Sequence, residues 1–200
     1  MSTRQSILDA ALPVFASKGF RGATVRDLCA AADVNIAAIN YHFGDKAALY
    51  AEVLTHAYAT LSTRPMPTLA DLGEAEAALQ AWVHWYIDRM LGGQAQTVDQ
   101  LMVHELSNPT GALETLAQRG IQPVFDALRE IIAALAPVPF DDDTVARFAL
   151  TVVGQCLIYR GSTGLLQQLE GVPVQNLDAI ADHIAAASIA AVRHATGVRT

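Results

Sequence analysis

The sequence predicts an all-helical fold, for three reasons. Alanine is abundant while runs of Val, Ile and Thr are short, which favours helices over strands. Apolar residues recur at helical spacing along most of the 200 residues. Gly, Pro, Asp and Asn fall between these segments, where helices begin and end. We therefore expect about nine helices and no strand.

Four helices are expected in the first 61 residues, and the residues between them start or stop helices. Gly19 ends the first helix, as glycine commonly does. Thr24 is the expected N-cap of the second, with Asp27 at the capping-box position. Gly44 ends the third helix and Asp45 caps the fourth. The expected ranges are 3–18, 25–32, 36–43 and 46–61.

Five longer helices are expected beyond a connector, residues 62–73, that contains two prolines. Gly92 and Asn108 mark the ends of the first two, and a bend is expected before Pro123 in the third. The acidic run in PVPFDDD precedes the fourth, at an N-terminus where the helix dipole favours it. The expected ranges are 74–91, 96–107, 111–136, 144–169 and 175–195.

Two short helices joined by a tight turn, after a longer first helix, form the layout of a helix-turn-helix unit. At 100° per residue, Ile36, Ile39 and Phe43 form an apolar wedge on the third helix that we expect to be buried. The other side carries small, polar and aromatic side chains without an acidic one. Alanines allow close approach to a major groove, and polar side chains reach base edges and phosphates. The expected DNA-facing residues of this helix are Ala37, Ala38, Asn40, Tyr41 and His42.

The charge distribution agrees with a DNA-reading N-terminal segment. The chain carries a net charge of −7, yet residues 1–60 hold five basic and five acidic side chains. The acidic excess therefore lies in residues 61–200. Lys46, in the first turn of the fourth helix, lies beside free backbone N–H groups where a phosphate can bind.

The run TVRDLCAAADVNIAAINYHFGDKAALYAEVL resembles the helix-turn-helix signature of the TetR (tetracycline-repressor-like) transcriptional regulators, over about residues 5–54. Asp33 stands where that family usually has glycine, and Asp tolerates the left-handed conformation that the turn needs. The resemblance implies contacts to the DNA backbone from Thr24, Arg26, Tyr41, His42 and Lys46. It implies that the bases are faced by Asn35, Ala37, Ala38 and Asn40. The segments 104–135 and 152–160 resemble the effector-domain patterns of one subgroup of this family, the CecR-like regulators.

The resemblance also implies a homodimer on a palindromic operator, because two reading helices must reach successive major grooves about 34 Å apart. Small residues on the last two helices would let them approach a second subunit and form a four-helix bundle. These residues are Ala146, Ala149, Gly154, Ala181, Ala185, Ser188 and Ala191. The alternative is that they pack within one subunit.

Aromatic and polar residues on the middle helices are candidates for an effector pocket. The candidate ligand-binding residues are Trp82, Trp85, Tyr86, Met102, His104, Glu105, Phe125, Gln155, Tyr159 and Arg160. The alternative is that the aromatic residues simply form the core. A bound small molecule would favour a dimer whose reading helices are spaced wrongly for the operator.

Other classes of protein lack support in the sequence. HExxH, GxSxG, P-loop and GxGxxG motifs are absent, which argues against an enzyme. Six histidines without a His-x3-His pair, and two distant cysteines, predict neither a metal site nor a cofactor. No stretch reaches the roughly 18 apolar residues of a membrane span, and the N-terminus lacks a secretory signal, so we expect a cytoplasmic protein without a membrane partner.

The sequence thus predicts a DNA-binding domain in residues 1–50 and an effector-binding and dimerisation domain in residues 51–200. The predicted function is sequence-specific regulation of transcription, with repression as the family's usual mode. The alternative is a helical ligand-binding or adaptor protein that does not bind DNA.

Overall fold

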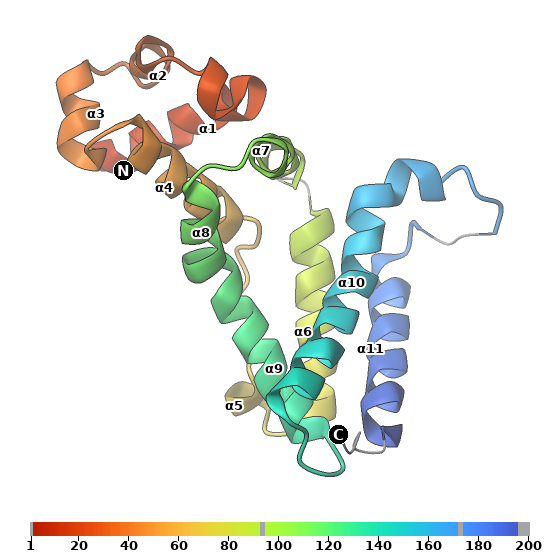
Figure 1. Cartoon of the computed structure of the whole chain (residues 1–200). Helices are drawn as coiled ribbons and strands as arrows, with labels where there is room; N and C mark the ends of the chain where they lie inside the picture. The colour runs from red at the N-terminus through yellow and green to blue at the C-terminus, as the bar shows by residue number, and fades with distance from the viewer. Residues whose placement is uncertain (1, 93–94, 172–173, 196–200) are drawn as a thin grey trace. The chain divides into compact units, whose positions relative to one another are not determined.

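The computed structural model describes residues 2–92, 95–171 and 174–195, and all regular structure in these ranges is helical (Figure 1). This confirms the all-helical prediction, with eleven α-helices in the described ranges, nine of them seven residues or longer. The helices of the N-terminal part are α1 Thr3–Gly22, α2 Val25–Ala32, α3 Ile36–Phe43 and α4 Lys46–Ala59. The others are α5 Leu69–Leu72, α6 Ala75–Leu91, α7 Ala95–Ser107, α8 Ala112–Leu116, α9 Gln122–Leu135, α10 Asp142–Leu166 and α11 Leu177–His194, with a π-helical segment, Ala117–Ile121, between α8 and α9.

The chain forms two compact units. Unit 1 comprises residues 1–61 and 93–122, and unit 2 comprises residues 62–92 and 123–200. The helices α7 and α8 therefore pack in the same unit as the predicted helix-turn-helix, although they lie far from it in sequence. The predicted boundary at residue 50 between a DNA-binding domain and an effector-binding domain concerns function, and it stays a prediction.

Unit 1 is built around α1, which packs against α2, α4 and α7, while α4 also packs against α8. Its interior is mostly apolar, apart from the buried carboxylate of Glu105 on α7, and each of α1, α2, α3, α4 and α7 contributes at least one fully buried side chain. These include Ile7, Phe15, Leu28, Ile39, Leu49, Tyr50 and Leu101.

Unit 2 is built around α6, which packs against α5, α10 and α11 (Figure 1). Cys156 of α10 is part of this core, and its burial raises the pKa of the thiol to about 12. Cys156 therefore packs as a small hydrophobic residue. Cys29 of α2, in unit 1, is half-buried.

Gly19, the predicted end of the first helix, and the bend predicted before Pro123 both appear as specific backbone features. In α1, Gly19 has φ 66° and ψ 176°, so the helix is broken there and only a short turn continues to Gly22. Before Pro123, the π-helical segment replaces regular α-helix. Pro123 has no N–H to donate to the carbonyl of Arg119, and this missing bond is consistent with the altered ladder.

One feature of the predicted wedge on α3 is wrong. Ile39 is buried and Phe43 is half-buried, but Ile36 is 57% exposed. Ile36 is the first residue of a helix only eight residues long. Periodicity gives the direction of its side chain, but no neighbouring element reaches far enough to cover it.

Candidate nucleic-acid interface

The helix α2 begins at a complete capping box. Thr24 Oγ1 accepts from the amide of Asp27 at 3.1 Å, and Asp27 Oδ2 accepts from the amide of Thr24 at 2.9 Å. The amide of Thr24, and then the ammonium of Lys18, lower the pKa of Asp27 to about 2. The first turn of α2, which carries the exposed Arg26, is thereby fixed by local bonds.

The turn between α2 and α3 has the conformation expected from Asp33. This residue has φ 51° and ψ 48°, a left-handed conformation, and ends α2. The exposed Asn35 then caps α3, with Oδ1 accepting from the amide of Ala38 at 3.0 Å. Part of the hydrogen-bonding capacity of Asn35 is therefore used within the protein, which the sequence prediction did not include.

The outer face of α3 presents the residues predicted to read DNA. Tyr41 is 85% exposed, and Ala37 and Asn40 are exposed as well. Ala38 and His42 are half-buried, and the ring of His42 lies 5.0 Å from that of Tyr41 in an edge-on arrangement. The face is narrow because two of its members are alanines, and it ends in a polar, aromatic rim.

Gly44 ends this helix with φ 88° and ψ −61°, a conformation that L side chains rarely adopt. Asp45 then caps α4, with Oδ1 accepting from the amide of Ala48 at 2.8 Å. The predicted boundaries of α3 are confirmed, and both follow from capping residues next to the helix.

Lys46 contacts the protein's own backbone. Its Nζ donates to the carbonyl oxygens of Phe20 at 2.8 Å and Ala23 at 2.9 Å, and lies 4.4 Å from the centroid of the Phe20 ring. Sequence reasoning missed this role, because these partners are 23 and 26 positions away.

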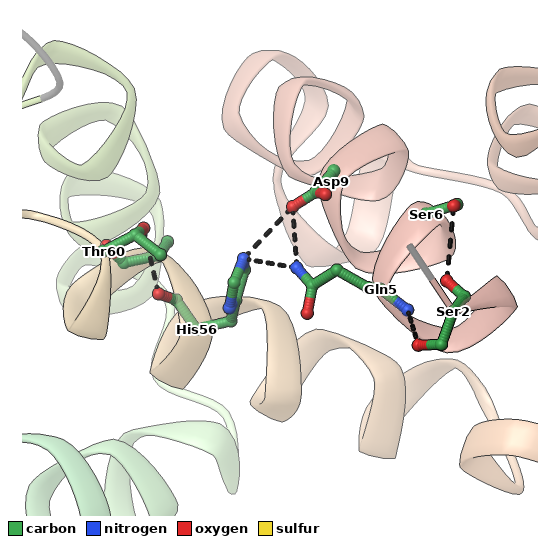
Figure 2. Close-up of polar contacts among 7 residues, drawn as sticks. Ser2, Gln5, Ser6, Asp9, His56 and Thr60 are labelled. Carbon is green, nitrogen blue, oxygen red and sulfur yellow. Dashed lines mark hydrogen bonds and ion pairs between the residues drawn. The ribbon is translucent and has the colours of Figure 1, made fainter. Parts of the chain in front are cut away.

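Polar contacts also hold α4 against α1 (Figure 2). His56 Nε2 lies 3.1 Å from Asp9 Oδ1 and 3.0 Å from Gln5 Nε2. Gln5 Nε2 donates to Asp9 Oδ1 at 3.0 Å, so the three side chains meet in one cluster. Arg4 adds an ion pair with Glu52 at 3.1 Å. These bonds help fix the helix that follows α3.

The comparisons with known proteins agree with this geometry. Residues 7–53 match the family described as "Bacterial regulatory proteins, tetR family". Residues 75–192, more than half of the chain, match the C-terminal domain of the "HTH-type transcriptional dual regulator CecR". The chain belongs to the TetR family. It is a DNA-binding transcriptional regulator with a CecR-type C-terminal domain.

This TetR-family regulator is 29% identical to the HTH-type transcriptional repressor NicS of Pseudomonas putida, over 96% of the chain and 91% of NicS. A solved transcriptional regulator from Rhodococcus sp. Rha1 has a TM-score of 0.64 at 17% identity, covering 98% of this chain and 100% of that one. AibR, solved in complex with isovaleryl coenzyme A and operator DNA, has a TM-score of 0.62 at 17% identity. The match covers 93% of this chain and 97% of the AibR chain. These structures share the fold. The family matches confirm that the protein is a regulator and not an enzyme.

The candidate ligand-binding residues of this TetR-family regulator are divided between the two units. In unit 2, Trp82, Trp85 and Tyr86 are buried on α6, with the rings of Trp82 and Tyr86 stacked at 4.7 Å. Arg160 Nη1 lies 2.8 Å from Met90 Sδ. The other three members in unit 2, all half-buried, are Phe125, Gln155 and Tyr159.

In unit 1, Glu105 is fully buried and already bound. Its carboxylate accepts from the amide of Thr110 at 2.7 Å and from the Thr110 hydroxyl, and it hydrogen bonds to Tyr50. The pKa of Tyr50 is raised, first by burial and then by this carboxylate. The ring of His104 lies against Gly19, and Met102 is half-buried. Glu105 thus joins α7 to α4, an arrangement that does not require a ligand.

One cavity in unit 2 is lined by none of these candidates. It has a volume of about 640 Å³ and is lined by residues of α5, α6, α9 and α11, including Gln80 and Leu135. Arg193, on its wall, forms an ion pair with Glu76. Among the described side chains, no three His, Cys, Asp or Glu residues gather in a way that holds a metal ion. No described helix is both long and apolar enough to cross a membrane.

Proposed function

We propose that this TetR-family regulator is a cytoplasmic repressor that binds a palindromic operator as a homodimer and leaves it when a small molecule binds the C-terminal domain. The observation that carries the proposal is the outer face of α3. It presents exposed Ala37, Asn40 and Tyr41, without an acidic side chain, on a helix capped at both ends.

The proposed DNA contacts fall into two groups. Ala37, Ala38 and Asn40, with Asn35 at the helix start, face the base edges, where the alanines meet thymine methyl groups and the amides pair with bases. Phosphates are contacted from both sides of this face. The residues proposed for phosphate contact are Thr24, Arg26, Tyr41 and His42. Lys46, which the sequence also assigned to a phosphate, donates to the protein's own carbonyls and is considered separately below.

The proposed dimer surface lies on α10 and α11. Of the small residues expected there, Ala149, Ala181, Ala185 and Ser188 are buried within the chain, as the alternative anticipated. The exposed residues described on α10 include an apolar stripe at helical spacing. Its members are Leu150 (59% exposed), Gly154, Leu157 (41%) and Ile158 (52%), and the exposed Ala186 and Ala190 lie on α11. A second copy covering this stripe would complete a four-helix bundle.

Two relatives support repression and control by a small molecule. NicS, which aligns with nearly the whole chain, is a repressor. AibR, which shares the fold, has been solved with both an acyl coenzyme A and operator DNA. In the proposed mechanism, the effector binds better to a dimer whose reading helices do not match the operator spacing, and so shifts the population toward it. We propose that the aromatic cluster of α6, with Arg160, contributes to the effector site.

The test starts by enriching a binding sequence from a random pool of DNA duplexes with the wild-type protein. Fluorescence anisotropy with the enriched duplex should then show that Tyr41→Ala weakens binding by about tenfold or more, since the substitution removes a good base or phosphate contact. Leu72→Ala, at a 43% exposed position of α5, is the matched control and should bind like wild type. If neither the pool nor the DNA upstream of the protein's own gene yields a binding sequence, the adaptor alternative is favoured.

A further inference from the structure

We propose that Lys46 acts as a positioning residue, which fixes the connection between α1 and α2 and so places Thr24 and Arg26 for their phosphates. This inference rests on the proposed operator binding, and it assigns most of the effect of Lys46 to contacts within the protein. If Lys46 acted only by contacting a phosphate, its loss would change the salt dependence of DNA binding and leave the α1–α2 connection unchanged. A positioning role predicts the opposite of both.

The connection between α1 and α2 contains two carbonyls whose usual hydrogen-bond donors are used elsewhere. In a continuing helix, the carbonyl of Phe20 would accept from the amide of Thr24, and that of Ala23 from the amide of Asp27. The capping box instead directs the Thr24 amide to Asp27 Oδ2 and the Asp27 amide to Thr24 Oγ1. The Lys46 ammonium donates to these same two carbonyls, at 2.8 and 2.9 Å. It therefore replaces the donors that the capping box removes.

The electrostatic surroundings of Lys46 favour the same contact. Lys46 is the first residue of α4, and a cation at the N-terminus of a helix is unfavourable because of the helix dipole. The carbonyls that it reaches belong to the short turn after the break at Gly19 and to the residue before the N-cap of α2, and their oxygens carry the partial negative charge that attracts an ammonium. The ring of Phe20, 4.4 Å from Nζ, adds a cation–π contact and lies 5.2 Å from the ring of Tyr50 in α4. These surroundings stabilise the ammonium where it is.

The contact of Lys46 joins the two ends of the segment from α2 to α3. Lys46 follows Gly44 and Asp45, which end α3 and cap α4, whereas Ala23 directly precedes the N-cap of α2. An ammonium has three N–H donors, and two of them are used by the carbonyls. Without the contact, we expect the α1–α2 connection to move more freely and Thr24 and Arg26 to lose their fixed places.

The first experiment measures operator affinity by anisotropy across a series of salt concentrations, with the duplex enriched by the wild-type protein. Removing one phosphate contact reduces the slope of log affinity against log salt by about 0.9. We expect Lys46→Met, which keeps the aliphatic stem, to weaken binding about tenfold at every salt concentration while the slope stays unchanged. The matched control Arg26→Met should reduce the slope by about 0.9. A reduction of that size in Lys46→Met as well would overturn the proposal.

The second experiment needs no DNA. Amide hydrogen exchange of the free protein, measured by mass spectrometry, should be faster in Lys46→Met than in wild type across residues 20–28 and unchanged in Arg26→Met. Equal exchange in Lys46→Met and wild type would overturn the proposal, whatever the affinities show. If the wild-type protein bound no DNA at all, the proposed function would fail, while the exchange measurement would still decide the role of Lys46.

Discussion

Gly19→Ala is the substitution for which the structure gives the clearest expected cost. Gly19 has φ 66° and ψ 176°, a region that is essentially open to glycine alone, so an alanine there adds about 1–3 kcal/mol of backbone strain. The new Cβ would also lie 3.0 Å from Nδ1 and 3.2 Å from Cγ of His104, so the ring must move. Together we expect a loss of about 2–4 kcal/mol in the free energy of unfolding.

Gly22→Ala is a matched control in the same helix. Its Cβ would meet only Lys18 Cβ, at an ordinary 3.5 Å, and the backbone of Gly22 is helical. Alanine has the higher helix propensity, so we expect Gly22→Ala to leave stability unchanged or raise it by about 0.5 kcal/mol. Urea unfolding followed by circular dichroism gives both values.

A double-mutant cycle separates the two parts of the cost. Adding His104→Ala to Gly19→Ala removes the steric part and leaves the backbone strain, so the cycle should return a coupling of about 1 kcal/mol. A Gly19→Ala protein as stable as wild type would show that neither the strain nor the contact with α7 exists in solution, and the reasoning would fail.

Two further predictions concern the capping box and the dimer. The pKa of Asp27 is lowered to about 2 in the folded protein, so the stability that its carboxylate contributes is present above its ordinary pKa of 3.8 and is lost as the pH falls through 2. The difference in the free energy of unfolding between wild type and Asp27→Asn should therefore shrink as the pH falls from 4 toward 2. A difference that stays constant over this range would contradict the assignment. For the dimer, Leu157→Asp should produce a monomer in analytical ultracentrifugation, because a carboxylate would be buried in the proposed four-helix bundle. Val138→Asp, at a 47% exposed loop position, should sediment like wild type, and a Leu157→Asp protein that does the same would exclude this surface as the interface.

Much of the helix-turn-helix segment, α2 and α3, could be predicted from the sequence, because local interactions set where each helix begins and ends. Thr24, Asn35 and Asp45 each cap a helix with their own side chain, and Gly44 adopts a conformation that suits glycine. The left-handed Asp33 follows from the same kind of argument. All of these bonds join residues within a few positions of one another, so the order of residue types contains the information.

The tertiary structure decided which surfaces are covered and which distant groups meet. Helical periodicity placed Ile36 on the apolar face of α3, but whether a neighbour covers that position depends on packing, and none does. The carbonyl partners of Lys46 and the contact of Glu105 with Tyr50 come from elements brought together by the fold. The sequence alone therefore determined the family and the reading helix, through local capping and spacing. Only the three-dimensional packing decided that α7 joins the DNA-reading unit and that Lys46 binds the protein's own backbone, because both depend on contacts between residues far apart in the chain.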